Sequence, residues 1–252
     1  SVRGNIPTRL SKYKNDHEID GIILAKAAID RLLSSDLPEM KIMQNEINKI
    51  ISISNWMVLP LSENPNAAAQ GALAIEIKKE RSDLKKILNP IHDSNTFENA
   101  IKERQILSSY GGGCHQKIGV AVLKHTYGNL TIIRGLTEQS IPIEKLELTH
   151  EGQKNIFHKF SAEQIWSTSS AQNFFDHSSL PWEADEKTNL FISKSSAIST
   201  DDLTRLKNFP VLWTAGNQTW KKLAQLGLWI NGSNESFGED FPSPKFMTLY
   251  FI

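Results

Sequence analysis

The sequence has a single cysteine, Cys114, among its 252 residues. One cysteine forms no internal disulfide, so cysteine usage does not indicate an oxidising compartment. The sequence has no apolar run long enough to cross a bilayer and no signal peptide, so we expect a cytoplasmic protein without a membrane partner. The formal net charge is zero, with 28 basic and 28 acidic residues. This balance argues against a general nucleic-acid-binding surface.

Internal repeats are also absent, and the length allows one large domain or two to three small ones. The chain starts at Ser1 without a methionine and ends on the apolar, strand-like run "FMTLYFI". We therefore expect it to be a piece of a longer protein.

Residues 1–63 have helical and strand-like patterns. "EIDGIILAKAAIDRLL" predicts a short strand over residues 21–24 and an amphipathic helix to about Leu33. "MKIMQNEINKIISI" predicts another helix, and "NWMVLP" predicts a strand stopped by Pro60.

In residues 64–82, Pro, Asn and Gly mark a loop, and "ALAIEI" then alternates like a strand. We interpret this segment as a crossing between domains.

Residues 83–149 predict a small α+β domain. A helix follows "DSN", with Thr96 or Ser94 as its cap and Phe97, Ile101 and Ile106 on its apolar face. It ends in "GGG", the preferred kind of helix terminator. Three short strands follow the cysteine and predict an antiparallel sheet.

The remaining residues differ in texture. Residues 150–187 are Ser-rich without a clear period and predict a linker. In residues 188–252, strand-like and helix-like stretches alternate, which predicts a partial α/β unit with a parallel sheet.

Several polar positions could carry chemistry. Arg3 and Arg9 flank a Gly-Asn turn and suit an acidic ligand, because guanidinium pairs two-point with carboxylate; the alternative is two solvated surface arginines. Arg31 closes a helix, where a cation is expected on dipole grounds. Gln70 and Gly71 could let a ligand approach the backbone, or could form a hinge or bulge.

Cys114 is the best single candidate. A lone cysteine is most often a buried small hydrophobe, but three preceding glycines argue against a core position here. No histidine lies at a cysteine-protease spacing, and no second cysteine exists for a zinc site, so we expect no metal. A thiol used as an attachment point remains.

The motifs "RGNIPTRLSK", "IDGIILAKAAIDRL", "AAAQGALAIE" and "ERQILSSYGGGCHQKIG" together resemble porphobilinogen deaminase (hydroxymethylbilane synthase), in that family's order. The resemblance covers about residues 1–145, the later part of the enzyme. It implies joining four porphobilinogen molecules into hydroxymethylbilane, with release of ammonia, on a dipyrromethane cofactor. It also implies that Cys114 holds the cofactor by a thioether. The resemblance further implies that the cofactor is bound by Arg3, Arg9, Arg31, Gln70 and Gly71.

The same resemblance implies the domain plan. Residues 1–63 would be the later part of a second, periplasmic-binding-protein-like domain, residues 64–82 a crossing segment and strand returning to the first domain, and residues 83–149 a third domain with the cofactor loop. We expect a monomer. The family's catalytic aspartate lies upstream of "RGN", so we predict no catalytic residue in this chain. His115 and Lys117 stand where the family more often has Gln and Pro.

The tail is similar to part of uroporphyrinogen-III synthase through "LFISKSSAI", "PVLWTAGNQTWKKLAQLG" and "ESFGED". This resemblance implies ligand loops containing Ser195, Ser196, Gly216 and Thr219, with backbone N–H groups facing carboxylates. Thr219 as a simple helix cap is the alternative.

The resemblances predict an enzyme of tetrapyrrole (heme) biosynthesis that acts on porphobilinogen, with this chain alone inactive. Two alternatives stay open. One is a fusion that also has uroporphyrinogen-III synthase activity. The other is a homologue that binds anions without catalysis.

Overall fold

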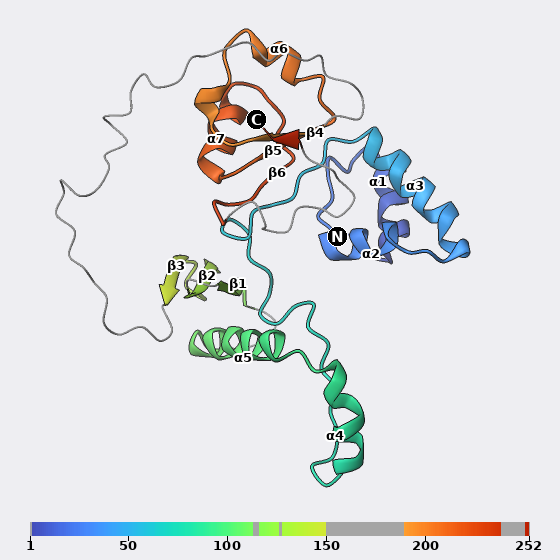
Figure 1. Ribbon diagram of the computed structural model, residues 1–252, viewed down its shortest axis with the longest axis vertical. Helices are drawn as coiled ribbons and strands as arrows, with labels where there is room; N and C mark the ends of the chain where they lie inside the picture. Colours follow the sequence, from blue (N-terminus) through green and yellow to red (C-terminus); the bar gives the residue numbers. More distant parts are fainter. Residues whose placement is uncertain (1, 113–115, 126–127, 150–188, 238–249, 252) are drawn as a thin grey trace, which may run out of the picture. The chain divides into compact units, whose positions relative to one another are not determined.

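The computed structural model describes residues 2–112, 116–125, 128–149, 189–237 and 250–251 (Figure 1). The chain divides into two compact units, and each is described by itself. The first contains Ser1–Val58 and Phe175–Ile252, and the second contains Leu59–Phe174. Both units contain helices together with a sheet, so the predicted mixed helix and sheet fold class is confirmed.

The first unit begins with three helices, α1 (Ile6–Asn15), α2 (Lys26–Leu33) and α3 (Lys41–Ser52), with a 3-10 turn η1 (Pro38–Met40) before α3. Asn5 caps α1, because its side chain accepts a hydrogen bond of 3.0 Å from Thr8 N. The helices share a small core in which Leu10, Ile47 and Ile50 are buried. The two predicted helices correspond to α2 and α3 and are confirmed, whereas α1 was not predicted.

The two strands predicted in this region do not form: residues 21–25 and 55–60 lie in no strand. A strand needs a neighbour along its length, and an apolar run cannot supply one by itself. Val58 N makes an isolated backbone hydrogen bond of 2.7 Å to Asn231 O instead of a ladder.

The tail of the first unit is an α/β layer. Its strands are β4 (Asn189–Ile192), β5 (Val211–Thr214), β6 (Gly232–Ser233) and β7 (Tyr250–Phe251), all pairing in parallel in the order β6-β5-β4-β7. The turn η5 (Ser195–Ala197) and the helices α6 (Asp202–Leu206) and α7 (Asn217–Gln225) connect them. The predicted parallel sheet is confirmed. Its core consists of Leu190, Ile192, Leu206, Phe209, Leu212, Leu223, Leu228 and Ile230.

The second unit holds α4 (Ser82–Leu88), a 3-10 turn η2 (Asn89–Ile91), α5 (Ser94–Ser109) and the strands β1 (Ile118–His125), β2 (Gly128–Leu136) and β3 (Pro142–Thr149). The strands form the predicted antiparallel sheet in the order β1-β2-β3. In Figure 1, α5 (green) runs beside β1. Ile118, Val120 and Ile133 are buried against Ile106 and Leu107 of α5.

Three expectations for this unit need comment. The cap of α5 is Asp93, which accepts from Thr96 N, and neither Thr96 nor Ser94 has that role. The strand predicted from "ALAIEI" is wrong, since residues 72–78 lie in no strand. The side chains of Leu73 and Ile75 are 98% and 60% exposed, so this stretch has no sheet to join among the described residues. The predicted linker, residues 150–187, lies outside the described residues.

Candidate functional site

The stem of the cysteine loop is well defined on both sides. α5 ends at Ser109, and Gly111 and Gly112 follow with φ of +104° and +67°. The side chain of Gln116 reaches back and donates from Nε2 to the carbonyl oxygen of Tyr110. A Cβ on Gly111 would lie 2.9 Å from that Nε2 atom, which could shift aside, so it is the left-handed backbone conformation that favours glycine here. Gly111 and Gly112 therefore let the chain turn directly after α5.

Cys114 itself lies outside the described residues, with Gly113 and His115. Its role as an attachment point stays a prediction. The structure instead describes what flanks it, which is a helix end on one side and the start of β1 on the other.

A cation lies beside this stem. Lys145 on β3 places its Nζ 5.7 Å from the centre of the Tyr110 ring. Hydrogen bonding to the Tyr110 side chain raises the pKa of Lys145. The amine is thus positively charged at neutral pH and would suit an acidic group held by the loop.

The predicted arginines lie in the first unit. Arg9 donates from Nε to the Gly4 carbonyl at 2.7 Å, which ties the "RGN" turn to α1. Arg3 is exposed just before that turn, and Arg31 is exposed in the last turn of α2. The Gly-Asn turn is therefore held by one of the two arginines that flank it.

Gln70 and Gly71 belong to the second unit and lie in a tight turn. Ala69 and Gly71 have φ of +61° and +92°, and Gln70 N donates to Ala67 O at 3.0 Å. Gln70 and Gly71 are both exposed, and a Cβ on Gly71 would meet no atom within 4 Å. The left-handed backbone at Gly71, rather than crowding, explains this glycine.

Glu103, which was not predicted as a site residue, holds this turn. The Glu103 carboxylate accepts from Ala69 N through Oε2 at 2.7 Å and from Val122 N through Oε1 at 2.9 Å. A signal was available: Glu103 shares one helix face with Ile106, Leu107 and Tyr110, at spacings of three, four and seven. A carboxylate on the inward face of a helix needs partners.

The tail loops meet at one edge of their sheet. β4, β5 and β6 are parallel, so the loops after Ile192, Thr214 and Ser233 leave from the same edge. Ser195 and Ser196 lie in η5, which packs beside α7. Gly216 is buried as the N-cap of α7, and Thr219 is the third residue of that helix. Thr219 as the helix cap is therefore wrong.

The third loop at this edge was not predicted as part of the site. Its residues Glu235 and Ser236 both have left-handed backbones, with φ of +55° and +65°. A Cβ on Gly216 would lie 2.4 Å from Ser236 Oγ. Glycine at 216 therefore lets the loop after β6 contact the start of α7.

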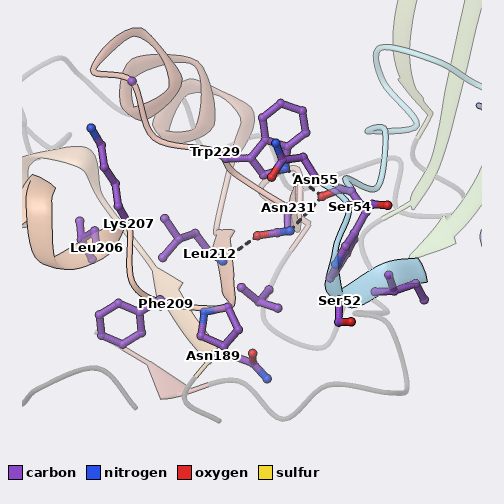
Figure 2. A pocket seen from close by; sticks show the side chains of 15 residues that line it. Ser52, Ser54, Asn55, Asn189, Leu206, Lys207, Phe209, Leu212, Trp229 and Asn231 are labelled. Carbon is purple, nitrogen blue, oxygen red and sulfur yellow. Dashed lines mark hydrogen bonds between the residues drawn. The ribbon is translucent and has the colours of Figure 1, made fainter. Parts of the chain in front are cut away.

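A cavity of about 550 Å³ opens at the other edge of this sheet, beside the first residues of β4 and β5 (Figure 2). Trp229 Nε1 and Asn231 Nδ2 both donate to the carbonyl oxygen of Trp56, at 3.0 and 2.9 Å. Asn231 Oδ1 also accepts from Leu212 N at 2.9 Å, so its amide links the wall of the cavity to β5. The predicted site residues of the first unit, Arg3, Arg9, Arg31, Ser195, Ser196, Gly216 and Thr219, are not among the described residues that line this cavity.

Two further observations concern the described part of the chain. No group of three or more His, Cys, Asp or Glu side chains lies there that could hold a metal ion. No helix there has the length and apolar character that a membrane span needs.

One family model matches the first part of the chain. Residues 1–86 match the family model described as "Porphobilinogen deaminase, dipyromethane cofactor binding domain". The match covers the "RGN" turn, the three helices and the Gln70–Gly71 turn, and ends before α5.

Curated relatives extend the similarity farther along the chain. The chain is 36% identical over 118 residues to a porphobilinogen deaminase from Clostridium novyi, covering 47% of this chain and 34% of that protein. It is 38% identical over 124 residues to a probable porphobilinogen deaminase from Sulfurisphaera tokodaii, covering 49% of this chain and 36% of that protein. It is 33% identical over 135 residues to the porphobilinogen deaminase of Lachnospira eligens, and this match covers 53% of this chain and 40% of that protein. The chain thus spans little more than a third of the length of these relatives.

Proposed function

We propose that this chain is part of a porphobilinogen deaminase, an enzyme of tetrapyrrole biosynthesis that converts four porphobilinogen molecules into hydroxymethylbilane. The observation that carries the proposal is the identity of 33–38% over 118–135 residues to proteins named as this enzyme. The family match over residues 1–86 is consistent with it.

The residues beside the cysteine loop fit a covalently held dipyrromethane. Gly111 and Gly112 turn the chain sharply before Cys114, and the Lys145 charge lies at the stem. Bound through the Cys114 sulfur, the group would supply a free α-carbon for the first condensation. In each condensation a C–N bond of porphobilinogen breaks with loss of ammonia, a C–C bond forms, and the α-carbon loses its proton.

In this proposal the chain's own residues tether and orient. Cys114 holds the primer, and the exposed guanidinium groups of Arg3 and Arg31 pair with acetate and propionate groups. Arg9 supports the turn beside Arg3 through its bond to the Gly4 carbonyl and offers its remaining N–H groups to a carboxylate. Gln70 and Gly71 present backbone to the same ligand.

Intact mass of the full-length protein tests the proposal. We expect an added mass of two pyrrole units on the wild-type protein and its absence from Cys114→Ser. Ser108→Ala is the matched control, because it changes an exposed hydroxyl on the same helix end and should leave the added mass in place. An unmodified Cys114 in the wild-type protein would contradict the proposal and favour a homologue that binds anions without catalysis.

The domain plan is part of the proposal. Residues 1–63 would complete a periplasmic-binding-protein-like second domain, residues 64–82 would cross toward the first domain, and residues 83–149 would form the third. The parent enzyme would act as a cytoplasmic monomer. Size-exclusion chromatography with light scattering checks the monomer.

For the tail, we propose a carboxylate-binding edge of the uroporphyrinogen-III synthase kind. The parallel sheet supports this, because Ser195, Ser196, Gly216 and Thr219 all follow carboxyl ends of its strands, where ligands of open α/β sheets bind. The full-length protein with hydroxymethylbilane should yield the type III isomer. Formation of the type I isomer alone, the spontaneous product, would exclude this activity.

A further inference from the structure

Glu103 connects three parts of the second unit. It lies on α5, its Oε2 accepts from Ala69 N at 2.7 Å, and its Oε1 accepts from Val122 N on β1 at 2.9 Å. Both oxygens of one carboxylate are therefore engaged by backbone donors from segments 34 and 19 residues away. Such charge-assisted bonds are shorter and stronger than neutral ones.

The segment before Ala69 is held to the same sheet at two more places. Val120 N donates to Asn66 O at 2.8 Å, and the Pro65 carbonyl oxygen lies so close to Gly119 that a Cβ there would be only 2.2 Å from it. Glycine at 119 therefore permits this close approach.

Arg134 on β2 makes the third attachment. Its Nε donates to the Ser62 carbonyl, and its Nη2 lies 3.3 Å from Glu63 Oε2. The chain from Ser62 to Ala69 is thus bound along its length to β1, β2 and α5. The next residues, Gln70 and Gly71, are exposed, and among the described residues their backbone bonds stay within the turn itself.

We propose that Glu103 is a positioning residue that sets where the Gln70–Gly71 turn stands relative to α5 and β1. This inference rests on the proposed function for the ligand that the turn would face. Ala69 is the last anchored residue before the turn, and its left-handed backbone makes the direction of the chain there depend on the bond to Glu103. Gln70 and Gly71 follow within two residues, so a change at Ala69 would redirect both.

The geometry argues for a carboxylate rather than an amide at this position. Both partners of Glu103 are N–H donors, and a glutamine has only one acceptor atom to offer them. Its NH₂ group would face the second N–H, so one of the two bonds must be lost.

Glu103→Gln in the full-length protein tests the inference, with Glu98→Gln as the matched control. Glu98 is on the same helix, but its exposed carboxylate only pairs with Lys124 at 3.7 Å. Amide hydrogen exchange of residues 69–71 should become at least tenfold faster in Glu103→Gln and stay unchanged in Glu98→Gln. A urea midpoint for global unfolding that is the same in Glu103→Gln and in the wild type would show that the change in exchange is local.

A second readout separates positioning from plain structural support. After exposure of apoprotein to porphobilinogen, the initial rate at which the dipyrromethane mass appears should fall at least tenfold in Glu103→Gln. Faster exchange with a wild-type loading rate would overturn the positioning role, as would unchanged exchange. If even the wild-type protein gains no such mass, the proposed function fails, while the exchange measurement still decides whether Glu103 anchors the turn.

Discussion

Trp213 donates a hydrogen bond of 2.7 Å from its indole Nε1 to Oδ1 of Asn234, and both side chains are buried. Trp213 lies on β5 and Asn234 directly follows β6, so the bond fixes the loop at the carboxyl edge of the tail sheet. A buried indole N–H without an acceptor is costly, which gives this pair a testable energetic role.

Asn234→Ala should lower the free energy of unfolding of the tail by about 1–3 kcal/mol, because the Trp213 indole N–H loses its acceptor. Urea denaturation followed by near-ultraviolet circular dichroism measures this. Asn208→Ala removes an exposed amide from the same layer and should have little effect. Equal stability of the two variants would show that the bond contributes nothing.

Ser199→Ala should destabilise the start of α6. Ser199 Oγ lies 2.6 Å from Oδ2 of the buried Asp202, and Asp202 N lies 3.3 Å from Ser199 Oγ, a reciprocal capping arrangement. Losing the bond to a buried carboxylate should cost about 1.5–3 kcal/mol by urea denaturation. The exposed Ser193→Ala is the control, and a loss as large as that in Ser199→Ala would contradict this account.

The α5 cap predicts a pH dependence. The backbone hydrogen bond from Thr96 lowers the pKa of Asp93. A carboxyl group with a lowered folded-state pKa stabilises the helix above its unfolded pKa, and this contribution is lost as the pH falls through the folded pKa. The protection of the Thr96 amide, its exchange rate compared with the intrinsic rate at the same pH, should therefore fall in acid.

Two variants separate charge from hydrogen bonding at this cap. Asp93→Asn keeps an acceptor without a titrating group, so its Thr96 exchange should lose the acid-dependent step. In Asp93→Ala the Thr96 amide loses its side-chain acceptor, so its protection should be low at every pH. The same acid step in Asp93→Asn as in the wild type would assign the step to another group.

Gly119→Ala should lower the free energy of unfolding of the second unit by about 1–3 kcal/mol, the usual range for overpacking. The new Cβ would meet the Pro65 carbonyl oxygen at 2.2 Å and push the segment off β1. Gly21→Ala is the matched control, since a Cβ there meets no atom within 4 Å. A fully stable Gly119→Ala would show that residues 65–66 move aside at no cost.

The elements that the sequence predicted well are those with local causes. α5 follows from its periodic face and the glycines after it, and the sheet of β1, β2 and β3 follows from short strands with turns between them. The strands expected at residues 21–24, 55–60 and in "ALAIEI" failed because pairing depends on residues far along the chain. An alternating pattern specifies a face without specifying a neighbour.

The site shows the same division. Glycines before Cys114 and the glycine at 71 could be recognised, because left-handed backbone is a local requirement. Glu103 could not be assigned from its own neighbours, since Ala69 and Val122 approach it only in the folded chain. Its place in line with Ile106 and Tyr110 marked an unusual carboxylate but did not name its partners.

The exposure of Leu73 and Ile75 has a practical consequence for handling the protein. An unpaired stretch of alternating apolar residues can add itself as a strand to the sheet edge of another molecule, so it limits the concentration at which chains stay apart. The charged residues that follow, from Glu76 to Arg81, interrupt that tendency by repulsion and hydration. These five charged residues oppose self-association through the exposed stretch, and salt, which screens their charges, should promote it.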